Sequence, residues 1–310
     1  MNKKPNVIIS FDFEIGWGDI TNQNWKLREN NGVYTRLRPV LKNMLDEMDN
    51  CEVPVTWATV GGMITAPDKR EIDHIPSDAR KIVRSVLSAA QKKSFDGRDL
   101  FEMVLSARAR HTFASHSYSH IPFHFRGVDD RYITTDLKLS LEALGNYGIS
   151  TDQFVFPENV EGYHEALLEN GIKTVRVAAD NGNVSRTRYL LSALMTAPPA
   201  SKTTMHESGL KQHYGSMLFN MGARRYHRLP FVCARAMRGL SRSCAQNTDL
   251  HLWAHPFNFA ESRFQLHAFR VILRRIALMR DKGLITISTC LLYTSPSPRD
   301  LSTSRMPSSA

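Results

Sequence analysis

Short apolar runs alternate with amphipathic stretches along this chain, and polar residues follow directly after several of the apolar runs. Residues 7–11 (VIISF) and 154–157 (FVFP) are typical of buried strands, whereas residues 36–48 place their apolar side chains on one helical stripe. Strand, helix, glycine and strand recur in this order, which predicts a parallel α/β fold. Since α/β barrels build their active sites at the carboxyl ends of strands, we expect the polar residues there to be functional.

The same patterns predict the remaining elements. Strands are expected within residues 53–62, 111–116, 172–178, 250–257 and 284–289. Helices are expected within residues 76–106, 134–144, 161–171 and 262–283. Ser262 is a possible N-cap of the last helix, and Gly283 is its expected stop. Residues 180–230 show neither pattern clearly, and we expect loops and short helices over the site there.

Composition narrows the class of protein. A hydrophobic content of 42% in 310 residues provides ample core for one large domain or two modest ones. The formal charge of +10 could attract nucleic acid, anionic lipid or anionic sugars, but no nucleic-acid-binding motif accompanies it. Much of the basic excess lies in residues 221–243, which form either a solvated surface or a patch for an anionic or phosphorylated substrate.

Cysteine usage and the N-terminus indicate the compartment. The four cysteines are scattered and form no CxxC pair, as expected in a reducing compartment. The first apolar run is too short for a signal peptide, and no stretch reaches the length of a membrane span. We therefore expect a soluble cytoplasmic protein without a transmembrane segment, and its oligomeric state stays open.

The last residues have a different character. Residues 290–310 are dominated by Ser, Pro and Thr, without apolar periodicity, and resemble the in-frame translation of a common sequencing-library adapter. We expect this tail to be non-native and disordered. The expected single domain is therefore 1–289, and the natural protein is expected to continue beyond Thr289.

Two polar clusters follow strand-like runs early in the chain. Asp12 and Glu14 are two residues apart, so a strand places both on the same side. Burying two carboxylates is costly unless they are paired or bind a metal; the alternative is a strand end that meets solvent. His116 and His120 are four apart, which places both rings on one face of a helical turn. Imidazole suits zinc and related metals, although two histidines can share a face without one.

A third cluster lies late in the chain. His251 and His255 belong to a strand-like run that Pro256 ends, so His255 is placed like an active-site residue; a core histidine is the alternative. A carboxylate with two histidines is a plausible ligand set for a catalytic metal with one open position. A second carboxylate could then act as general base, and a separate histidine as general acid.

Five motifs in this order, SFDFE…GWGD, TWATVGG, SHSYSH, FVFPENVEGY and LHLWAHPFNF, resemble the polysaccharide deacetylases of carbohydrate esterase family 4. The resemblance extends from about residue 6 to residue 289 and is greatest to the cytoplasmic-type members associated with surface-polysaccharide synthesis. It implies a distorted (β/α)7 barrel. It also implies metal-dependent hydrolysis of the N-acetyl group of an amino sugar in a polysaccharide, oligosaccharide or precursor.

The resemblance also implies roles for individual residues. His116 and His120 match the two metal-binding histidines of the family, and His255 matches the late histidine that protonates the leaving amine. We assign Asp12 as the base and Glu14 as a metal ligand, and the reverse assignment stays open. The implied cofactor is a divalent metal, with zinc expected, and the implied partner is an acetylated sugar.

The chain departs from the family at two places. Phe13 stands where many members have a second, adjacent aspartate. The segment around Pro157 lacks the arginine that usually steadies the base, and Val155 and Glu158 flank the proline instead. Backbone N–H groups near Glu158 and Asn159 could still form an oxyanion hole.

These departures leave alternatives for the function. Trp253 and Tyr163 could shape a sugar site, although such aromatic residues are often only part of the core. The same fold could hydrolyse another amide or an O-acetyl group. It could also bind a glycan without turnover, if the changed residues weaken catalysis.

Overall fold

The computed structural model describes residues 4–178, 196–220 and 229–289. These residues form one sheet of ten strands. The strands are β1 (Asn6–Phe13), β2 (Thr56–Thr59), β3 (Thr112–Ser115), β4 (Gln153–Val155), β5 (Thr174–Val177), β6 (Thr203–Met205), β7 (Lys211–Tyr214), β8 (Met217–Leu218), β9 (Leu250–Ala254) and β10 (Thr286–Ile287). All strand pairs are parallel except β6 with β7.

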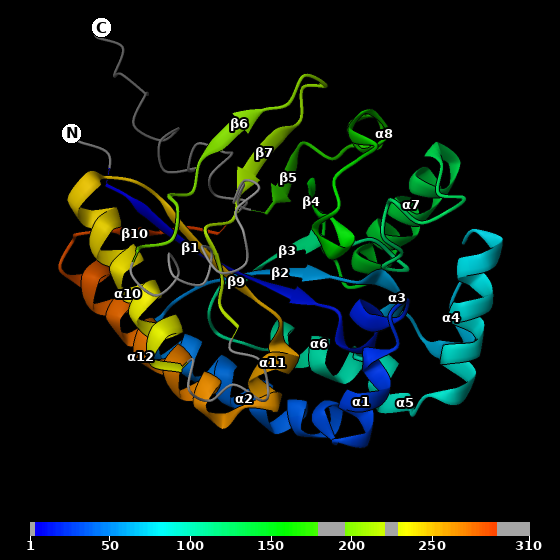
Figure 1. Cartoon of the computed structure of the whole chain (residues 1–310), viewed down its shortest axis with the longest axis horizontal. Helices are drawn as coiled ribbons and strands as arrows, with labels where there is room; N and C mark the ends of the chain where they lie inside the picture. Colours follow the sequence, from blue (N-terminus) through cyan, green and yellow to red (C-terminus); the bar gives the residue numbers. More distant parts are fainter. Residues whose placement is uncertain (1–3, 179–195, 221–228, 290–310) are drawn as a thin grey trace, which may run out of the picture.

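Helices connect the strands and cover the outside of the sheet. They are α1 (Asn24–Asn30), α2 (Val33–Cys51), α3 (Gly61–Ile64), α4 (Ser77–Ala89), α5 (Lys92–Phe95), α6 (Arg98–Leu105), α7 (Asp130–Gly145), α8 (His164–Glu169), α10 (Leu229–Gln246), α11 (Pro256–Glu261) and α12 (Arg263–Asp281). The described residues also form the short 3₁₀ helices η1 (Ile15–Asp19), η2 (Pro67–Lys69) and η3 (Pro157–Asn159). In Figure 1, α10 and α12 lie along one flank of the molecule, and α4 and α7 lie along the opposite flank.

The strand order explains how the sheet curves into a barrel. The order is β6-β7-β5-β4-β3-β2-β1-β9-β8, with β10 beside the start of β1. The segment 211–218 pairs with β5 through β7 and then with β9 through β8. Between these two strands, the N–H of Gly215 donates to Val177 of β5, and the N–H of Ser216 donates to His251 of β9. One segment thus joins both edges, and the predicted distorted (β/α)7 barrel is confirmed.

The main core lies between the strands and the surrounding helices. Helix α2 buries Leu37, Leu41 and Met44 completely and packs against α11 and α12. This is the helical stripe that the sequence predicts for residues 36–48. The inside of the barrel differs, because it holds a small apolar cluster of Ala58, Ala114 and Val155 together with buried polar side chains.

The prediction for residues 180–230 is wrong where the structure describes them. Residues 203–205, 211–214 and 217–218 are strands, rather than the expected loops and short helices. These strands have no continuous apolar run, because the two buried positions in the middle of β7 are polar. His213 pairs in register with Arg176 and faces the barrel interior, whereas Gln212 points to the opposite face and bonds Glu161. Ser262 does precede α12, but its side chain makes no capping hydrogen bond.

The remaining expectations concern membrane spans, the cysteines, the basic segment and the C-terminal tail. Among the described residues, no helix is both long and apolar enough to cross a membrane. Cys51, Cys233 and Cys244 are free thiols. Residues 221–228 of the basic segment, and the whole of the tail 290–310, lie outside the described residues.

Candidate active site

The predicted site residues meet at the carboxyl end of the barrel. Asp12 is the penultimate residue of β1, and Glu14 follows the end of this strand directly. His116 and His120 follow β3, and His255 follows β9. In the sheet, β1 lies between β2 and β9 (Figure 1). The residues that follow these parallel strands, although distant in sequence, therefore lie at the same end of the barrel.

Glu14, His116 and His120 form one tight, buried cluster. Glu14 Oε2 lies 3.1 Å from His116 Nε2 and 2.9 Å from His120 Nε2. The two Nε2 atoms are 3.2 Å apart. The Nδ1 of His116 donates to the carbonyl of Val155 at 2.8 Å, which leaves the Nε2 lone pair facing the cluster.

This cluster has the donor set of a zinc site. A tetrahedral ion with bonds of about 2.0–2.1 Å holds its ligand atoms roughly 3.3 Å apart, close to the separations within the cluster. Two imidazoles and one carboxylate leave a fourth position for water or substrate. Among the described residues, no other group of histidine, cysteine or acidic side chains converges in this way. The residues present therefore fit the metal that the motifs imply.

The electrostatics of the cluster favour a cation. Burial opposes ionisation of Glu14, but the neighbouring histidines outweigh it and hold the pKa of this carboxyl well below its usual value. Burial also lowers the pKa of His120, yet the charge and hydrogen bond of Glu14 outweigh it, so the pKa of His120 is raised. Both shifts show that positive charge beside Glu14 is stabilised.

The loop that carries the two histidines is not the helical turn expected from their spacing. Ser117 and His120 have φ values of 61° and 56°, so the backbone at both residues is left-handed. The carboxylate of Asp136 on α7 accepts the N–H groups of residues 118 and 119 at 2.7 and 3.1 Å. This buried acceptor holds the loop in a shape that brings both imidazoles to Glu14.

Asp12 is held by an arginine, Arg176, that lies outside all five sequence motifs. Arg176 on β5 donates to both carboxylate oxygens of Asp12, at 2.5 and 2.7 Å, and both side chains are nearly fully buried. Burial opposes ionisation of Asp12, but Arg176 outweighs it and lowers the pKa of the carboxyl. The available signal was an arginine inside a valine-rich buried strand, which is costly without a partner.

His255 lies between the two carboxylates. Its Nε2 is 3.3 Å from Glu14 Oε1 and 3.8 Å from Asp12 Oδ2. The side chain is 21% exposed, whereas those of His116 and His120 are nearly inaccessible, so solvent reaches the ring of His255. His251 is instead a core residue: it is fully buried, and its Nε2 bonds the hydroxyl of Ser10 at 2.8 Å.

The segment Pro157–Asn159 forms η3, which Phe156 separates from the end of β4. Glu158 is exposed, and its charge helps to raise the pKa of His120, so it lies near the cluster of Glu14, His116 and His120. The N–H of Asn159 donates to the carbonyl of Phe156 at 3.0 Å, so this group, predicted for an oxyanion hole, is engaged within the turn. The side-chain oxygen of Asn159 accepts a hydrogen bond from Arg176 at 3.3 Å.

The two aromatic residues predicted to shape a sugar site are less open than expected. Trp253 is 8% exposed, and the guanidinium of Arg176 lies over its ring at 4.6 Å from the centroid. Tyr163 is partly buried and donates its hydroxyl to the carbonyl of Val128. Trp253 therefore supports the Asp12–Arg176 pair from inside the barrel.

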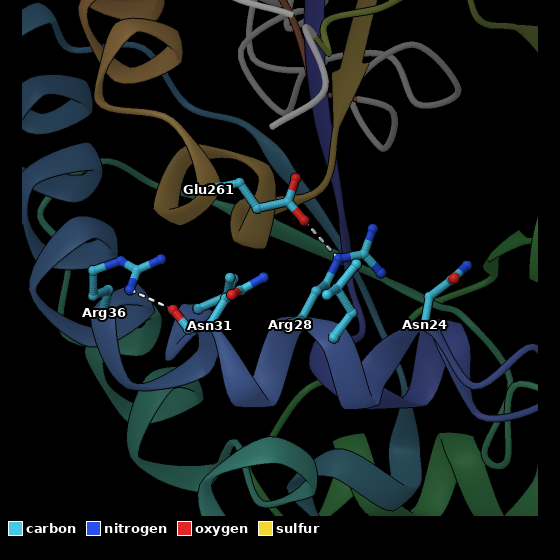
Figure 2. A pocket seen from close by; sticks show the side chains of 7 residues that line it. Asn24, Arg28, Asn31, Arg36 and Glu261 are labelled. Carbon is cyan, nitrogen blue, oxygen red and sulfur yellow. Dashed lines mark hydrogen bonds and ion pairs between the residues drawn. The ribbon is translucent and has the colours of Figure 1, made fainter. Parts of the chain in front are cut away.

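A pocket of about 610 Å³ lies beside this site, between α1 and α11 (Figure 2). Arg28 bonds Glu261 across the pocket at 2.7 Å and also pairs with Asp19 of η1. Its guanidinium covers the ring of Phe257, which in turn stacks on His255. The arginine thus connects the segment after β1 with the segment after β9. The lining residues are Asn24, Leu27, Arg28, Asn31, Val33, Arg36 and Glu261.

Comparisons with known proteins agree with this architecture. No protein-family model and no curated protein sequence matches the chain. Among solved structures, a protein from Mycobacterium smegmatis, provisionally described as a polysaccharide deacetylase, superposes with a TM-score of 0.65 at 15% identity, over 94% of this chain and 90% of that one. The allantoinase Puue superposes with a TM-score of 0.59 at 10% identity, over 92% and 87% of the two chains.

A GH57-type branching enzyme from the hyperthermophilic archaeon Pyrococcus horikoshii superposes with a TM-score of 0.57 at 10% identity, over 95% of this chain and 71% of that one. Several different activities therefore share this fold, and such likenesses speak to architecture alone. The chain has the fold of a polysaccharide deacetylase, the family that its sequence motifs resemble.

Proposed function

We propose that this chain is a metal-dependent deacetylase that hydrolyses the N-acetyl group of an amino sugar in a polysaccharide, oligosaccharide or biosynthetic precursor. The observation that carries the proposal is the convergence of Glu14, His116 and His120 beside Asp12 and His255, at the carboxyl end of the barrel. Three ligands, a base and a proton donor are the groups that amide hydrolysis needs.

Glu14, His116 and His120 would hold the metal, and zinc suits this mixture of imidazole and carboxylate ligands. When bound, a divalent ion supplies a Lewis acid that polarises the acetyl carbonyl and lowers the pKa of water. The carbonyl of Val155 fixes the tautomer of His116, so this ring presents a lone pair without rearrangement.

Asp12 and His255 would move the protons. Asp12 takes a proton from the water that attacks the acetyl carbon, and its lowered pKa keeps it ionised before the reaction. His255 then donates its Nε2 proton to the sugar nitrogen as the C–N bond breaks. The products are acetate and a free amino sugar, so the reaction hydrolyses a carbon–nitrogen bond that is not a peptide bond.

At both departures from the family pattern, another residue of this chain supplies the group that is missing. Phe13 is fully buried and packs on Trp57 at 5.2 Å between ring centroids, so it belongs to the core. Glu14, one residue later, supplies the second carboxylate. Arg176 contacts Asp12 from another strand. These contacts favour a catalytic site over a weakened binding site.

The proposal is tested by acetate release from N-acetylchitopentaose, with the chelator-treated protein measured before and after zinc is added. We expect zinc-dependent release that His116→Ala and Asp12→Asn abolish, whereas the control Gly145→Ala, at the end of α7, keeps it. An O-acetylated xylo-oligosaccharide is the matched ester probe. Sugar binding by calorimetry without any acetate release would contradict the proposal and favour a glycan-binding protein.

A further inference from the structure

We propose that Arg176 on β5 is the positioning residue for Asp12, and that it replaces, from the neighbouring strand, the arginine that the Pro157 segment lacks. This inference rests on the proposed function, because it assigns Asp12 as the general base. The contact itself, however, can be tested without any activity.

The contacts of Arg176 are those of a positioning group. Its two terminal nitrogens reach the two oxygens of Asp12, a bidentate geometry that fixes both the place and the plane of the carboxylate. One of these nitrogens also donates to the hydroxyl of Ser10 at 3.2 Å, and the other to Asn159 Oδ1 at 3.3 Å. The ring of Trp253 covers the guanidinium. Four partner residues from three segments, β1, η3 and β9, therefore set the orientation of the arginine.

Arg176 reaches Asp12 across the inside of the barrel. Strands β4, β3 and β2 separate β5 from β1 in the sheet. Ala58 on β2 is the register partner of Asp12, and Ala114 on β3 is the register partner of Ala58. These two small side chains face the barrel interior beside Val155, so the space between β5 and β1 can hold a long arginine side chain.

The register of β4 and β5 explains why a neighbouring strand can supply this group. Val155 pairs directly with Arg176. Paired residues on adjacent parallel strands lie about 4.8 Å apart and point to the same face of the sheet. Val155 precedes Pro157 by two residues, in the segment where the motif resemblance leads us to expect an arginine. Since Val155 holds His116 only through its carbonyl, its side chain can be exchanged without removing that bond.

The decisive experiment is a positional exchange. Arg176→Val is expected to lower kcat for N-acetylchitopentaose about 100-fold, the cost of a misplaced catalytic group, while KM and zinc affinity stay unchanged. In the double variant Val155→Arg/Arg176→Val, the guanidinium returns to the same face of the sheet from the adjacent strand. We therefore expect its kcat to be about tenfold higher than that of Arg176→Val. Val155→Arg alone is the control for the effect of the new arginine by itself.

Arg176→Lys is the second variant, in case removal of the charge prevents folding. Lysine keeps the charge but loses the parallel pair of hydrogen bonds, so kcat is expected to fall about tenfold with zinc affinity retained. Full kcat in Arg176→Val, or no recovery in a folded, zinc-loaded exchange variant, would overturn the proposal. Zinc affinity that falls together with kcat would also overturn it, because Arg176 would then support the whole site.

A thermodynamic cycle separates this inference from the proposed function. The free energy of unfolding in urea is measured for Asp12→Asn, Arg176→Met and the double variant. If the residues form a pair, the double variant is less destabilised than the sum of the single variants. If the wild-type protein releases no acetate from any probe, the proposed function fails, and the cycle alone tests whether Asp12 and Arg176 interact. Losses in the free energy of unfolding that simply add in the double variant would then overturn the proposed interaction.

Discussion

Gly18 lies directly against the carboxylate of Glu14, so closely that no larger residue fits. A Cβ atom at position 18 would lie 2.0 Å from Glu14 Oε1 and 2.3 Å from its carboxyl carbon. Glu14 leaves β1 and turns back over η1, and the missing side chain of Gly18 makes room for its carboxylate. The glycine thus helps to set the position of the carboxylate that we propose as a metal ligand.

Gly18→Ala is therefore expected to displace the Glu14 carboxylate from the two histidines. We expect zinc affinity to fall about 10- to 100-fold, as it does when the support of a ligand is lost. The measurement is competition with a chelating dye. Gly145→Ala, where a Cβ meets nothing within 4 Å, is the matched control and should bind zinc like the wild type. Equal affinities in the two variants would refute the role of Gly18.

Asp136 is expected to support the histidine loop. Asp136→Asn removes part of an acceptor that serves two backbone N–H groups, the hydroxyl of Ser119 and the ring of His74. A buried donor left without its acceptor costs about 1–3 kcal/mol, so we expect a loss of that size in the free energy of unfolding, together with weaker zinc binding. Glu142→Gln, an exposed position on the same helix, controls for the loss of charge. Unchanged zinc affinity in Asp136→Asn would show that the loop keeps its shape without this acceptor.

Removal of the metal is expected to destabilise the protein through the same cluster. A ligand at 100 times its dissociation constant stabilises the native state by about 2.7 kcal/mol. Zinc should therefore raise the melting temperature of chelator-treated protein ending at Thr289. The double variant His116→Ala/His120→Ala should show no such rise. Mass spectrometry should find about one zinc per chain in the wild type, as a single three-ligand site requires, and none in the variant. Folded wild-type protein that takes up no zinc would mean that the histidines only share a buried site.

Stability is expected to decrease as the pH falls from about 6.5 to 4. Burial lowers the pKa of His213 to about 4, so the folded protein keeps this ring neutral where the unfolded chain binds a proton. The unfolded state then binds more protons, and the free energy of unfolding falls with pH by on the order of 3 kcal/mol for this residue. Burial lowers the pKa of His111 to about 4 as well, so the two contributions add.

His213→Gln is expected to flatten this pH dependence in part, and the exposed His267→Gln is expected to leave it unchanged. Urea unfolding at several pH values between 4 and 7 measures both. The same slope in His213→Gln and in the wild type would show that His213 is not kept neutral by burial. The hydroxyls of Ser201 and Thr203, which bond His213 at 3.2 and 3.0 Å, remain available to glutamine.

Much of the fold could be predicted because its signals are local. The apolar runs that become β1, β4 and β9, and the stripe of α2, depend on neighbours a few residues away. The clustering of Asp12, Glu14 and the three histidines also follows from a simple rule, since polar residues at the carboxyl ends of parallel strands meet at one edge. These features can therefore be predicted without knowing how the elements pack.

The sequence by itself determined the class of fold, the position of the candidate site and the main side chains that gather there. Only the tertiary structure decided the rest, because those features depend on contacts between residues far apart in the chain. Arg176 meets Asp12 over 164 positions of sequence, and His116 meets Glu14 over 102. The polar strands around His213 form because their partners are buried hydroxyls and rings, which no local pattern records. The left-handed loop of His120 likewise depends on an acceptor supplied by α7.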